Sequence, residues 1–346
     1  MKDYLRLNHA EVVEDPRKAN GPVYYMPHHA IIKDDRKTTK LRIVFDASSH
    51  EAGALSLNDC QFAGPSLNPD IVEMLMQFRL NKVAIAGDLE KAFLQIGLNE
   101  LDRDATRFLW VEDDWQQGQP LKIKVLRMSR VLFGMKASPY LLAAAIRHHA
   151  RKYEDTCPIT SKLLDQNLYV DDFITGAATA PLAHRIYQEA KTIMAAGGMR
   201  LCKWATNNDQ LRRQWYEEGE LPEETVIEPL KILGMMWDQT NDTLFFPARV
   251  VLEKLAKISP TKRGILEIAA HLYDPLGFLA PVIVTLKCLL QELWKQKIDW
   301  DTEIPPDLQK KWGHWCKEFD ELPRVRVDRW YGTEVEGQSV SATFIL

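Results

Sequence analysis

Alternation of hydrophobic and polar residues predicts strands in several short stretches of the first two thirds of the chain. Residues 24–33 and 40–48 alternate on either side of a polar turn, which predicts a hairpin. Two more strands are predicted at residues 106–111 and 121–128, around an acidic, Gln-rich loop. Residues 231–247 predict another hairpin, with QTND at its turn. Antiparallel hairpins therefore account for most of the expected sheet.

Helical periodicity of the apolar residues predicts three helices within this region and a mainly helical end of the chain. The helix over 138–154 is expected to begin with Ser138 as its cap and Pro139 in its first turn. The other helices are predicted at residues 66–80, 181–198 and through about 250–320. Residues 1–20 lack periodicity and are interpreted as a leader or linker. The order of elements predicts an α+β unit followed by a helical unit.

Composition and charge exclude several classes of protein. The chain has 346 residues, of which 46% are hydrophobic and 27% charged, and its net charge is −4, so nucleic acid could be bound only by a local basic patch. Five scattered cysteines, without a CxxC pair, favour a reducing compartment over zinc or disulfides. The polar N-terminus is unlike a secretory signal, and the apolar stretch 278–290 is too short for a membrane span. We expect a cytoplasmic or nuclear protein that is not secreted.

Carboxylates occur at two predicted strand ends. Asp171 and Asp172 lie in NLYVDDFITG (167–176), which predicts two short strands at a tight bend, and Asp88 follows the apolar strand VAIAG (83–87). Taken singly, each aspartate could be an ordinary turn residue. Together they suit Mg²⁺, which binds a few carboxylates and leaves its other positions to water and phosphate. Two such ions support phosphoryl transfer.

At these residues the sequence resembles a known family. YVDDFITG is similar to the signature of reverse transcriptases, and four further motifs resemble theirs in order: GDLEKAFLQIGL (87–98), FGMKASPYLL (133–142), GGMRLCKWATN (197–207) and ILGMMWD (232–238). Within that superfamily the chain looks like the BEL/Pao group of LTR retrotransposons, and the segments that carry this likeness are 24–48, 56–67, 273–282 and 289–301. The resemblance covers about residues 8–325.

The resemblance implies an α+β right-hand polymerase fold, with fingers, a palm built on an antiparallel sheet, and a helical thumb or connection. It implies fingers and palm over residues 21–246 and the thumb or connection over 247–325, between a leader at 1–20 and a tail at 326–346. The implied activity is RNA-directed DNA polymerisation. The implied partners are an RNA or DNA template with its primer, dNTPs and other products of a pol polyprotein, but no membrane.

The resemblance also implies the catalytic residues. Asp88 and Asp171 would ligate two Mg²⁺ ions, with Mn²⁺ as an alternative metal. Asp172 would be the third carboxylate, and the backbone carbonyl of Leu89 a further ligand.

Five residues are implied to contact the nucleotide. Phe93 would lie under the sugar and exclude a 2′-hydroxyl, although any Phe can equally be a core residue. Lys33 and Arg42, on the first hairpin, would bind the triphosphate, unless they belong to a solvated run of charges. Gly134 would shape the loop beside the templating base, and Lys203 would lie near the leaving pyrophosphate.

Template and primer contacts are implied at Ser138, Pro139, Tyr169, Met235 and Trp237, and packing is the alternative role for Met235 and Trp237. The chain has Phe133 where retroviral enzymes usually carry Gln, so the polar contact assigned to that Gln is not expected. A basic cluster suits either a duplex backbone or a solvated face; it comprises Lys254, Lys257, Lys262 and Arg263.

Three alternatives for function remain open at this point. The first is the polymerase. The second is a catalytically idle nucleic-acid-binding remnant of a retroelement, and the third is a polymerase that makes RNA, which Phe93 disfavours. We expect no aspartic protease site in residues 1–20, and a tail too short for an RNase H, as in a polyprotein fragment or a degenerate copy.

Overall fold

The computed structural model describes residues 1–19, 21–32, 41–112, 118–221 and 227–332. The chain divides into two compact units, each assembled from three separate segments. The first unit comprises Met1–Asn68, Asp88–Asp171 and Gln188–Cys202, and the second comprises Pro69–Gly87, Asp172–Tyr187 and Lys203–Leu346.

The first unit is built on an antiparallel sheet with strand order β1-β6-β5, whose strands are β1 (Ala10–Val12), β5 (Arg107–Val111) and β6 (Ile123–Met128). The predicted hairpin forms β2 (His28–Ile32) and β3 (Leu41–Phe45), also antiparallel. Phe45 and Phe108 pack edge-to-face in a core that also contains Leu126 and Met128. The strands predicted in this region are thus confirmed.

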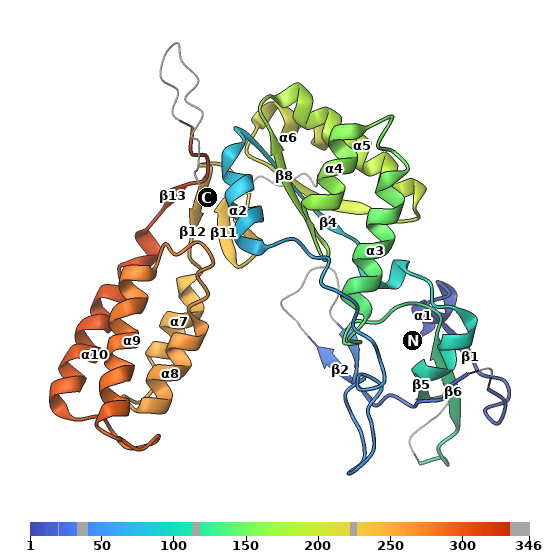
Figure 1. Ribbon diagram of the computed structural model, residues 1–346, viewed down its shortest axis with the longest axis horizontal. Coiled ribbons are helices and arrows are strands. Elements are labelled where there is room, and N and C mark those ends of the chain that lie inside the picture. The colour runs from blue at the N-terminus through green and yellow to red at the C-terminus, as the bar shows by residue number, and fades with distance from the viewer. Residues whose placement is uncertain (20, 33–40, 113–117, 222–226, 333–346) are drawn as a thin grey trace. The chain divides into compact units, whose positions relative to one another are not determined.

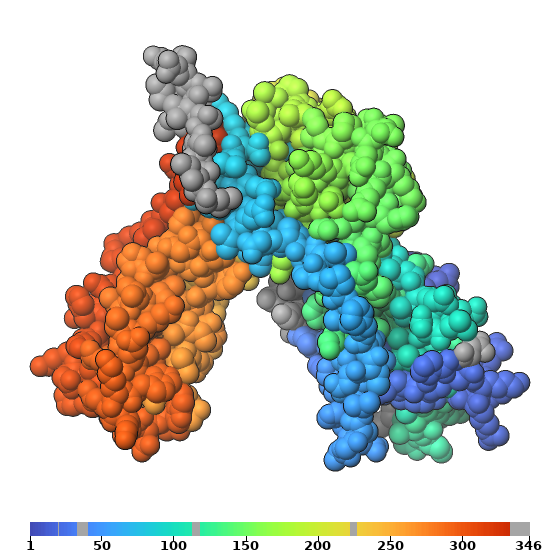
Figure 2. Space-filling view, in the orientation of Figure 1, coloured from blue at the N-terminus to red at the C-terminus, as the bar shows by residue number. Residues whose placement is uncertain are grey.

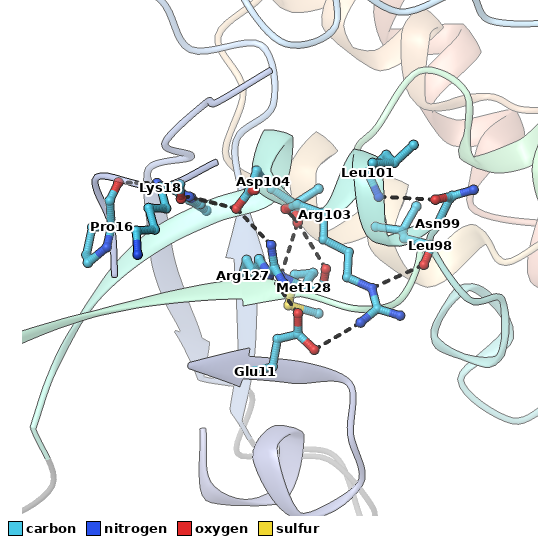
Figure 3. A network of polar contacts seen from close by, with 12 residues as sticks. Glu11, Pro16, Lys18, Leu98, Asn99, Leu101, Arg103, Asp104, Arg127 and Met128 are labelled. Atoms are coloured by element: carbon cyan, nitrogen blue, oxygen red, sulfur yellow. Dashed lines mark hydrogen bonds and ion pairs between the residues drawn. The ribbon is translucent and has the colours of Figure 1, made fainter. Parts of the chain in front are cut away.

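Residues 1–20 do not form the expected leader or linker, because most of them are folded into the first unit. They contain α1 (Lys2–Arg6) and β1, whose Ala10 pairs with Met128. Figure 3 shows how Glu11 of β1 accepts hydrogen bonds from Arg127 and Arg103, at 2.6 and 3.0 Å. A three-residue strand is too short to show periodicity, and these ion pairs hold it in place.

Buried charges continue this network on β5 and η2 (Glu100–Thr106). Asp104 and Arg107 are each 1% exposed, and one oxygen of Asp104 accepts from both Arg107 and Arg127. Asp104 and Arg127 are labelled in Figure 3. Arg107 also donates to the backbone carbonyls of Pro16 and Lys18, at 2.8 Å each. Arg107 therefore holds the segment after β1, which contains Pro16 and Lys18, against strand β5.

Besides α1 and η2, the first unit contains the helices α3 (Ser138–Arg151), α4 (Pro158–Gln166) and the short η1 (Ala92–Gln95). The helix at 138–154 is confirmed, but Ser138 is not its cap: Ala137 occupies that position, and the Ser138 hydroxyl donates to the Leu132 carbonyl at 2.6 Å. The buried hydroxyl satisfies a carbonyl of the preceding loop instead of a helical N–H group.

A four-stranded sheet has the order β7-β8-β4-β9. Its strands are β7 (Leu168–Tyr169), β8 (Asp172–Ala177), β4 (Val83–Leu89) and β9 (Leu201–Thr206). The boundary between the units falls within β4 and β9 and between β7 and β8. The predicted buried strand at 83–87 and the two short strands of NLYVDDFITG are both confirmed.

In the second unit, α2 (Ile71–Leu80) begins at Asp70, whose side chain accepts from the amides of Val72 and Glu73. The long helix α5 (Ala180–Ala196) contributes to both units, and α6 (Asp209–Glu217) lies in the second. Tyr187, Trp204 and Trp215 pack ring against ring in the core, with centroids 4.7 to 5.8 Å apart.

The second unit also contains an antiparallel sheet of order β10-β11-β12-β13, formed by β10 (Leu230–Ile232), β11 (Met235–Asp238), β12 (Thr243–Phe245) and β13 (Val327–Asp328). Leu233 and Gly234 join β10 to β11 with φ of 43° and 96°, as in a two-residue type I′ turn. The predicted hairpin at 231–247 is confirmed. Residues 327–332 differ from the expected tail, because β13 pairs with β12.

Up to residue 332, where the described part of the chain ends, four helices follow this hairpin in the second unit: α7 (Ala248–Leu255), α8 (Lys262–His271), α9 (Ala280–Lys295) and α10 (Pro306–Phe319), with η3 (Leu322–Arg324) after them. Figure 1 shows α8, α9 and α10 side by side, and their atoms form one packed body in Figure 2. Trp312 and Trp315 stack within its core. The predicted helical region is confirmed. Among the described residues, no helix is long and apolar enough to cross a membrane.

Candidate active site

Asp88 and Asp171 are brought together by the backbone of their strands. The amide of Leu89 donates a 2.7 Å hydrogen bond to the carbonyl of Asp171, which places the end of β4 against the bend between β7 and β8. Asp88 is half-buried and Asp171 is exposed. Two aspartates that are 83 positions apart in the sequence therefore lie at one edge of the first unit.

The bend itself is strained. Val170, immediately before Asp171, has φ of 57°, a left-handed conformation that is costly for a β-branched residue. Such strain persists only where the surrounding structure enforces it, and it concentrates at functional sites. Asp172 follows as the first, half-buried residue of β8, and Tyr169 precedes the bend as the half-buried end of β7.

Cys202 of strand β9 also lies beside Asp88. The Cys202 thiol donates to the Asp88 carbonyl at 3.4 Å, and its sulfur lies 3.8 Å from the carboxylate Oδ1. The Glu90 amide donates to the Arg200 carbonyl at 2.9 Å, which ties the same two segments together. The sequence pattern did not single out Cys202 for the site. Its position within GGMRLCKWATN was the available signal.

The donor set at this edge fits a hard divalent cation. The two Asp carboxylates carry oxygen atoms of the kind that such a cation binds, and Asp172 follows Asp171 in the chain. Within the part of the chain that the structure describes, no group of three His, Cys, Asp or Glu side chains is arranged to hold a metal. Mg²⁺ does not require such a cage, because it is commonly held by one or two carboxylates together with water and substrate phosphates.

Phe93 lies on η1, directly after this edge of the sheet. Its ring is half-buried and stands 5.9 Å from the ring of Phe133, at an interplanar angle of 58°. Phe133 is 76% exposed. Phe93 is therefore not a fully buried core residue, and an uncovered aromatic surface lies beside it. Its role under a sugar ring stays a prediction.

The loop that carries Phe133 is held by Asn58. The Asn58 side chain donates to the Gly134 carbonyl at 3.0 Å and to the Ser48 hydroxyl at 2.8 Å, and it accepts from the Lys136 amide at 2.8 Å. Gly134 has φ of 95°, which explains the need for glycine. Asn58 fixes the loop from both sides of this turn.

Asn58 had no role assigned from the sequence, although it lies in SLNDCQFAGPSL. Its own turn is fixed by Asp59, which accepts from the Ser56 hydroxyl at 2.6 Å and whose pKa is lowered by that hydrogen bond. In the same motif, Gly64 lies so close to Tyr140 of α3 that an added Cβ would come within 2.4 Å of the ring. The motif thus supports the Phe133 loop and the start of α3.

The remaining predicted residues around the nucleotide are distributed as follows. Arg42 is exposed on β3, opposite Ile31, and its charge partly offsets the burial that raises the pKa of Tyr4. Lys33 lies outside the described residues. Lys203 is exposed on β9, next to Cys202, with φ of 51°. Pro139 is exposed in the first turn of α3, whereas Ser138 is buried.

Met235 and Trp237 are buried, at 1% and 0% exposure. The Trp237 indole N–H donates to Asp242 at 3.0 Å, and its ring packs edge-to-face on Phe78. Burial favours the packing alternative for both side chains, and their contact with a primer stays a prediction.

The predicted basic cluster at 254–263 is largely paired within the second unit. Lys254 forms an ion pair with Glu267, and Arg263 forms a two-bonded ion pair with Asp301. Lys262 is 7% exposed, with its ammonium 4.1 Å from the centre of the Trp294 ring. Three of its four cations thus have partners within the unit, and Lys257 is exposed.

Comparison with known families identifies the chain. The model described as "Reverse transcriptase (RNA-dependent DNA polymerase)" matches residues 31–204, a range that includes Asp88, Asp171 and the Phe133 loop. The chain belongs to the reverse transcriptase family. A search of curated proteins gives no match.

Solved reverse transcriptases confirm the right-hand polymerase fold. A foamy viral protease-reverse transcriptase in complex with double-stranded DNA has a TM-score of 0.60 at 15% identity, covering 92% of this chain and 46% of that one. A foamy viral protease-reverse transcriptase with an RNA/DNA hybrid has a TM-score of 0.57 at 16% identity, covering 92% and 36%. This reverse transcriptase thus spans less than half the length of either.

The retrotransposon group is confirmed as well. Residues 261–344 match the model described as "Pao retrotransposon-like RNaseH-like domain". The description names an RNaseH-like domain, whereas the prediction from the sequence concerned only the tail, which was expected to be too short for an RNase H. The described residues of this range nevertheless form α8, α9, α10, η3 and β13. The thumb or connection assignment of the reverse transcriptase remains a proposal.

Proposed function

We propose that this chain is the RNA-directed DNA polymerase domain of a BEL/Pao-type retrotransposon and extends a primer with dNTPs by a two-metal mechanism. The observation that carries the proposal is the hydrogen bond from the Leu89 amide to the Asp171 carbonyl, which brings the end of β4, with Asp88, against the strained bend that carries Asp171. Membership of the reverse transcriptase family supplies the reaction class.

The carboxylates of Asp88 and Asp171 would hold Mg²⁺, or Mn²⁺ in its place, with Asp172 as a third carboxylate and the Leu89 carbonyl as a further ligand. Bound metal supplies charge neutralisation for phosphoryl transfer and an activated attacking hydroxyl. The Cys202 thiol donates to the backbone carbonyl of the half-buried Asp88, and its sulfur lies 3.8 Å from the carboxylate Oδ1, so this strand end would be positioned before substrate arrives. Preorganisation of this kind lowers the cost of reaching the transition state.

The nucleotide would lie over Phe93. Its half-buried ring would leave no room for a 2′-hydroxyl, and the ring of Phe133 lies 5.9 Å from it. Arg42 and Lys33 would bind the triphosphate, and Lys203 would assist departure of the pyrophosphate. Gly134 and Pro139 would shape the loop and helix beside the templating base, and Tyr169 would lie near the primer end.

The proposed partners are an RNA or DNA template with its primer. The two foamy viral structures contain a DNA duplex and an RNA/DNA hybrid, which supports this choice for a chain of the same fold. Other pol polyprotein products are further proposed partners. We place the chain in the cytoplasm, within a virus-like particle, or in the nucleus; its five cysteines are free, as in a reducing compartment.

Primer extension with purified protein, Mg²⁺ or Mn²⁺ and dNTPs, on matched RNA and DNA templates, tests the proposal. Asp171→Asn should reduce extension on the order of a hundredfold or more, because it removes one metal-binding charge. Asp155→Asn is the matched control, an exposed aspartate of the same unit, and should extend normally. No extension by the wild type, or full extension by Asp171→Asn, contradicts the proposal.

Two further outcomes identify the rival functions. Salt-sensitive binding of template–primer without incorporation indicates the idle nucleic-acid-binding remnant. Equal use of rNTPs and dNTPs by the wild type, unchanged in Phe93→Ala, indicates an RNA-making polymerase and removes the assigned role of Phe93.

A further inference from the structure

Arg329 is a fully buried cation in the segment 327–331, which follows the helical bundle. Its side chain is 0% exposed. It donates through Nη1 to the carbonyls of Phe78 and Asn81 and through Nη2 to the carbonyl of Lys82. Carbonyls at the C-terminal end of a helix lack partners within the helix, and a cation placed there satisfies them. The segment 327–331 is thus fastened to the end of α2.

Arg79 of α2 makes the reciprocal contacts. It is 2% exposed and donates to the carbonyls of Asp328 and Arg329, at 2.8 and 3.0 Å. It also donates to the hydroxyl of Tyr331, whose ring centre lies 3.5 Å from its Cζ and whose amide donates to the Arg79 carbonyl at 3.0 Å. Each segment therefore supplies the cation that binds the backbone of the other.

Asp242, on the turn between β11 and β12, is the carboxylate that pairs with Arg329. Nε of Arg329 donates to Oδ1 at 2.6 Å, and Nη2 donates to Oδ2 at 2.9 Å. This is the two-bonded fork that a guanidinium offers to a carboxylate. The Arg329 amide also donates to the Asp242 carbonyl at 2.9 Å. The segment 327–331 is therefore bound to this turn as well as to α2.

Asn207 extends these contacts to the start of β4. Its side-chain nitrogen donates to Oδ2 of Asp242 and to the carbonyl of Lys82, at 2.9 Å each. Its side-chain oxygen accepts from the Ala84 amide at 2.9 Å. The Lys82 carbonyl, directly before β4, thus accepts from both Asn207 and Arg329. The residues that hold the segment 327–331 also fix the start of β4.

The four side chains that join these segments are called the clasp: Arg79, Asn207, Asp242 and Arg329. Two of them are cations and one is an anion. Burial lowers the pKa of Arg79, and the like charge of Arg329 adds to this effect. A buried guanidinium without its partners is costly, so a half-open clasp is less stable than a closed or a fully hydrated one. The clasp is therefore expected to open as one unit.

We propose that residues 327–331 form a latch. The closed clasp fixes the start of β4, and its opening frees the end of α2, the β11–β12 turn and the start of β4 together. Residues 83–87 of β4 lie in the same unit as the latch, and the strand continues to Asp88. The consequence for catalysis rests on the proposed polymerase function, whereas the shared opening does not.

Hydrogen exchange of the wild-type protein, measured at single amides by mass spectrometry, tests the shared opening. Three amides donate to the clasp: Ala84 to Asn207, Arg329 to Asp242 and Tyr331 to Arg79. One opening should expose all three, so their protection factors should agree within about threefold. Protection of Ala84 that differs from that of the other two by more than this overturns the proposal.

Arg329→Lys tests the role of the clasp, because lysine keeps the charge but cannot form the fork and reach three carbonyls together. It should speed exchange of the three amides by one common factor, about tenfold to a hundredfold. Arg79→Lys should affect the same three amides. The double variant should exchange little faster than either single variant, because one broken contact already opens the clasp.

Arg107→Lys is the matched control. Arg107 is also buried, pairs with Asp104 and donates to the carbonyls of Pro16 and Lys18, but it belongs to the first unit. It should leave exchange of the three amides within twofold. Faster exchange of Tyr331 without that of Ala84 in Arg329→Lys, or single effects that multiply in the double variant, overturns the proposal.

Two further outcomes separate the latch from the polymerase function. If Arg329→Lys does not fold, the comparison of the three amides in the wild type decides the proposal by itself. In an active wild type, Arg329→Lys should lower kcat for primer extension by about tenfold or more, with the KM for dNTP within twofold. An unchanged kcat overturns the link to Asp88. A wild type with one shared opening that does not extend a primer contradicts the polymerase function alone.

Discussion

Removing the charge of Asp104 is the sharpest test of the buried network in the first unit. Asp104→Asn preserves shape but removes the anion shared by Arg107 and Arg127. Oδ1 of Asp104 accepts from Nε and lies 2.8 Å from Nη2 of Arg107, and it also accepts from Arg127 at 3.0 Å. The substitution therefore affects three close N–H groups through one atom.

The loss in free energy of unfolding depends on which partners Arg127 and Arg107 keep after the substitution. Arg127 keeps Glu11 at 2.6 Å, so its charge remains compensated. Arg107 is 1% exposed and keeps only the uncharged carbonyls of Pro16 and Lys18 besides its contact with Tyr25. Removing one partner of a buried ion pair costs about 3–5 kcal/mol. We expect a loss of that size in the free energy of unfolding of the first unit.

Urea unfolding followed by hydrogen exchange in residues 10–18 measures this loss. With an m-value of about 2–3 kcal/mol/M, the midpoint for the first unit should fall by about 1–2.5 M. The comparison variant is Asp301→Asn, which breaks a fork of similar lengths with Arg263 that is exposed to solvent. Its effect should be far smaller, since solvent screens an exposed pair. A loss below about 1 kcal/mol for Asp104→Asn, or equal losses for both, refutes the reasoning.

Three further predictions concern packing, protonation and thiol reactivity. Gly176→Ala should cost about 1–3 kcal/mol in thermal unfolding, because its Cβ would lie 2.6 Å from the Val83 carbonyl; normal stability contradicts this. Burial lowers the pKa of His28, and the charge of its neighbour His29 adds to this effect, so the unfolded chain binds more protons below pH ~6.5. The free energy of unfolding should therefore fall as pH drops from 7 to 5, less so in His28→Phe, and equal pH profiles would contradict this. Burial raises the pKa of Cys316 to about 11, so iodoacetamide should alkylate the exposed Cys288 well before Cys316, as peptide mass spectrometry would show.

Long elements of this fold were predictable because their side chains repeat with a clear period. The buried strand β4 and the helices α3 and α10 each bury one face or both, and that burial appears directly as hydrophobic spacing. Strands β1 and β13 were missed because they contain three and two residues. Their place in the fold depends on partners far along the chain.

In the candidate site too, some residues were predictable from the sequence and others were not. Asp88 and Asp171 were predicted because short motifs carry them. Asn58, Cys202 and Arg329 were not assigned roles, because each acts largely on backbone carbonyls of distant segments. Such contacts leave no pattern in the residues they touch, since any residue has a carbonyl. Only the folded chain shows which ones meet.

The bond from Arg329 to the Phe78 carbonyl closes a span of 251 residues, which has a consequence for synthesis. A ribosome adding about 5–20 residues per second needs about 10–50 s to make that span. Until residue 329 is made, the carbonyls at the end of α2 have no Arg329 side chain to bind, and neither has Asp242 of the β11–β12 turn once that turn is made. A nascent chain stalled before residue 329 therefore lacks the contact that joins these parts of the second unit.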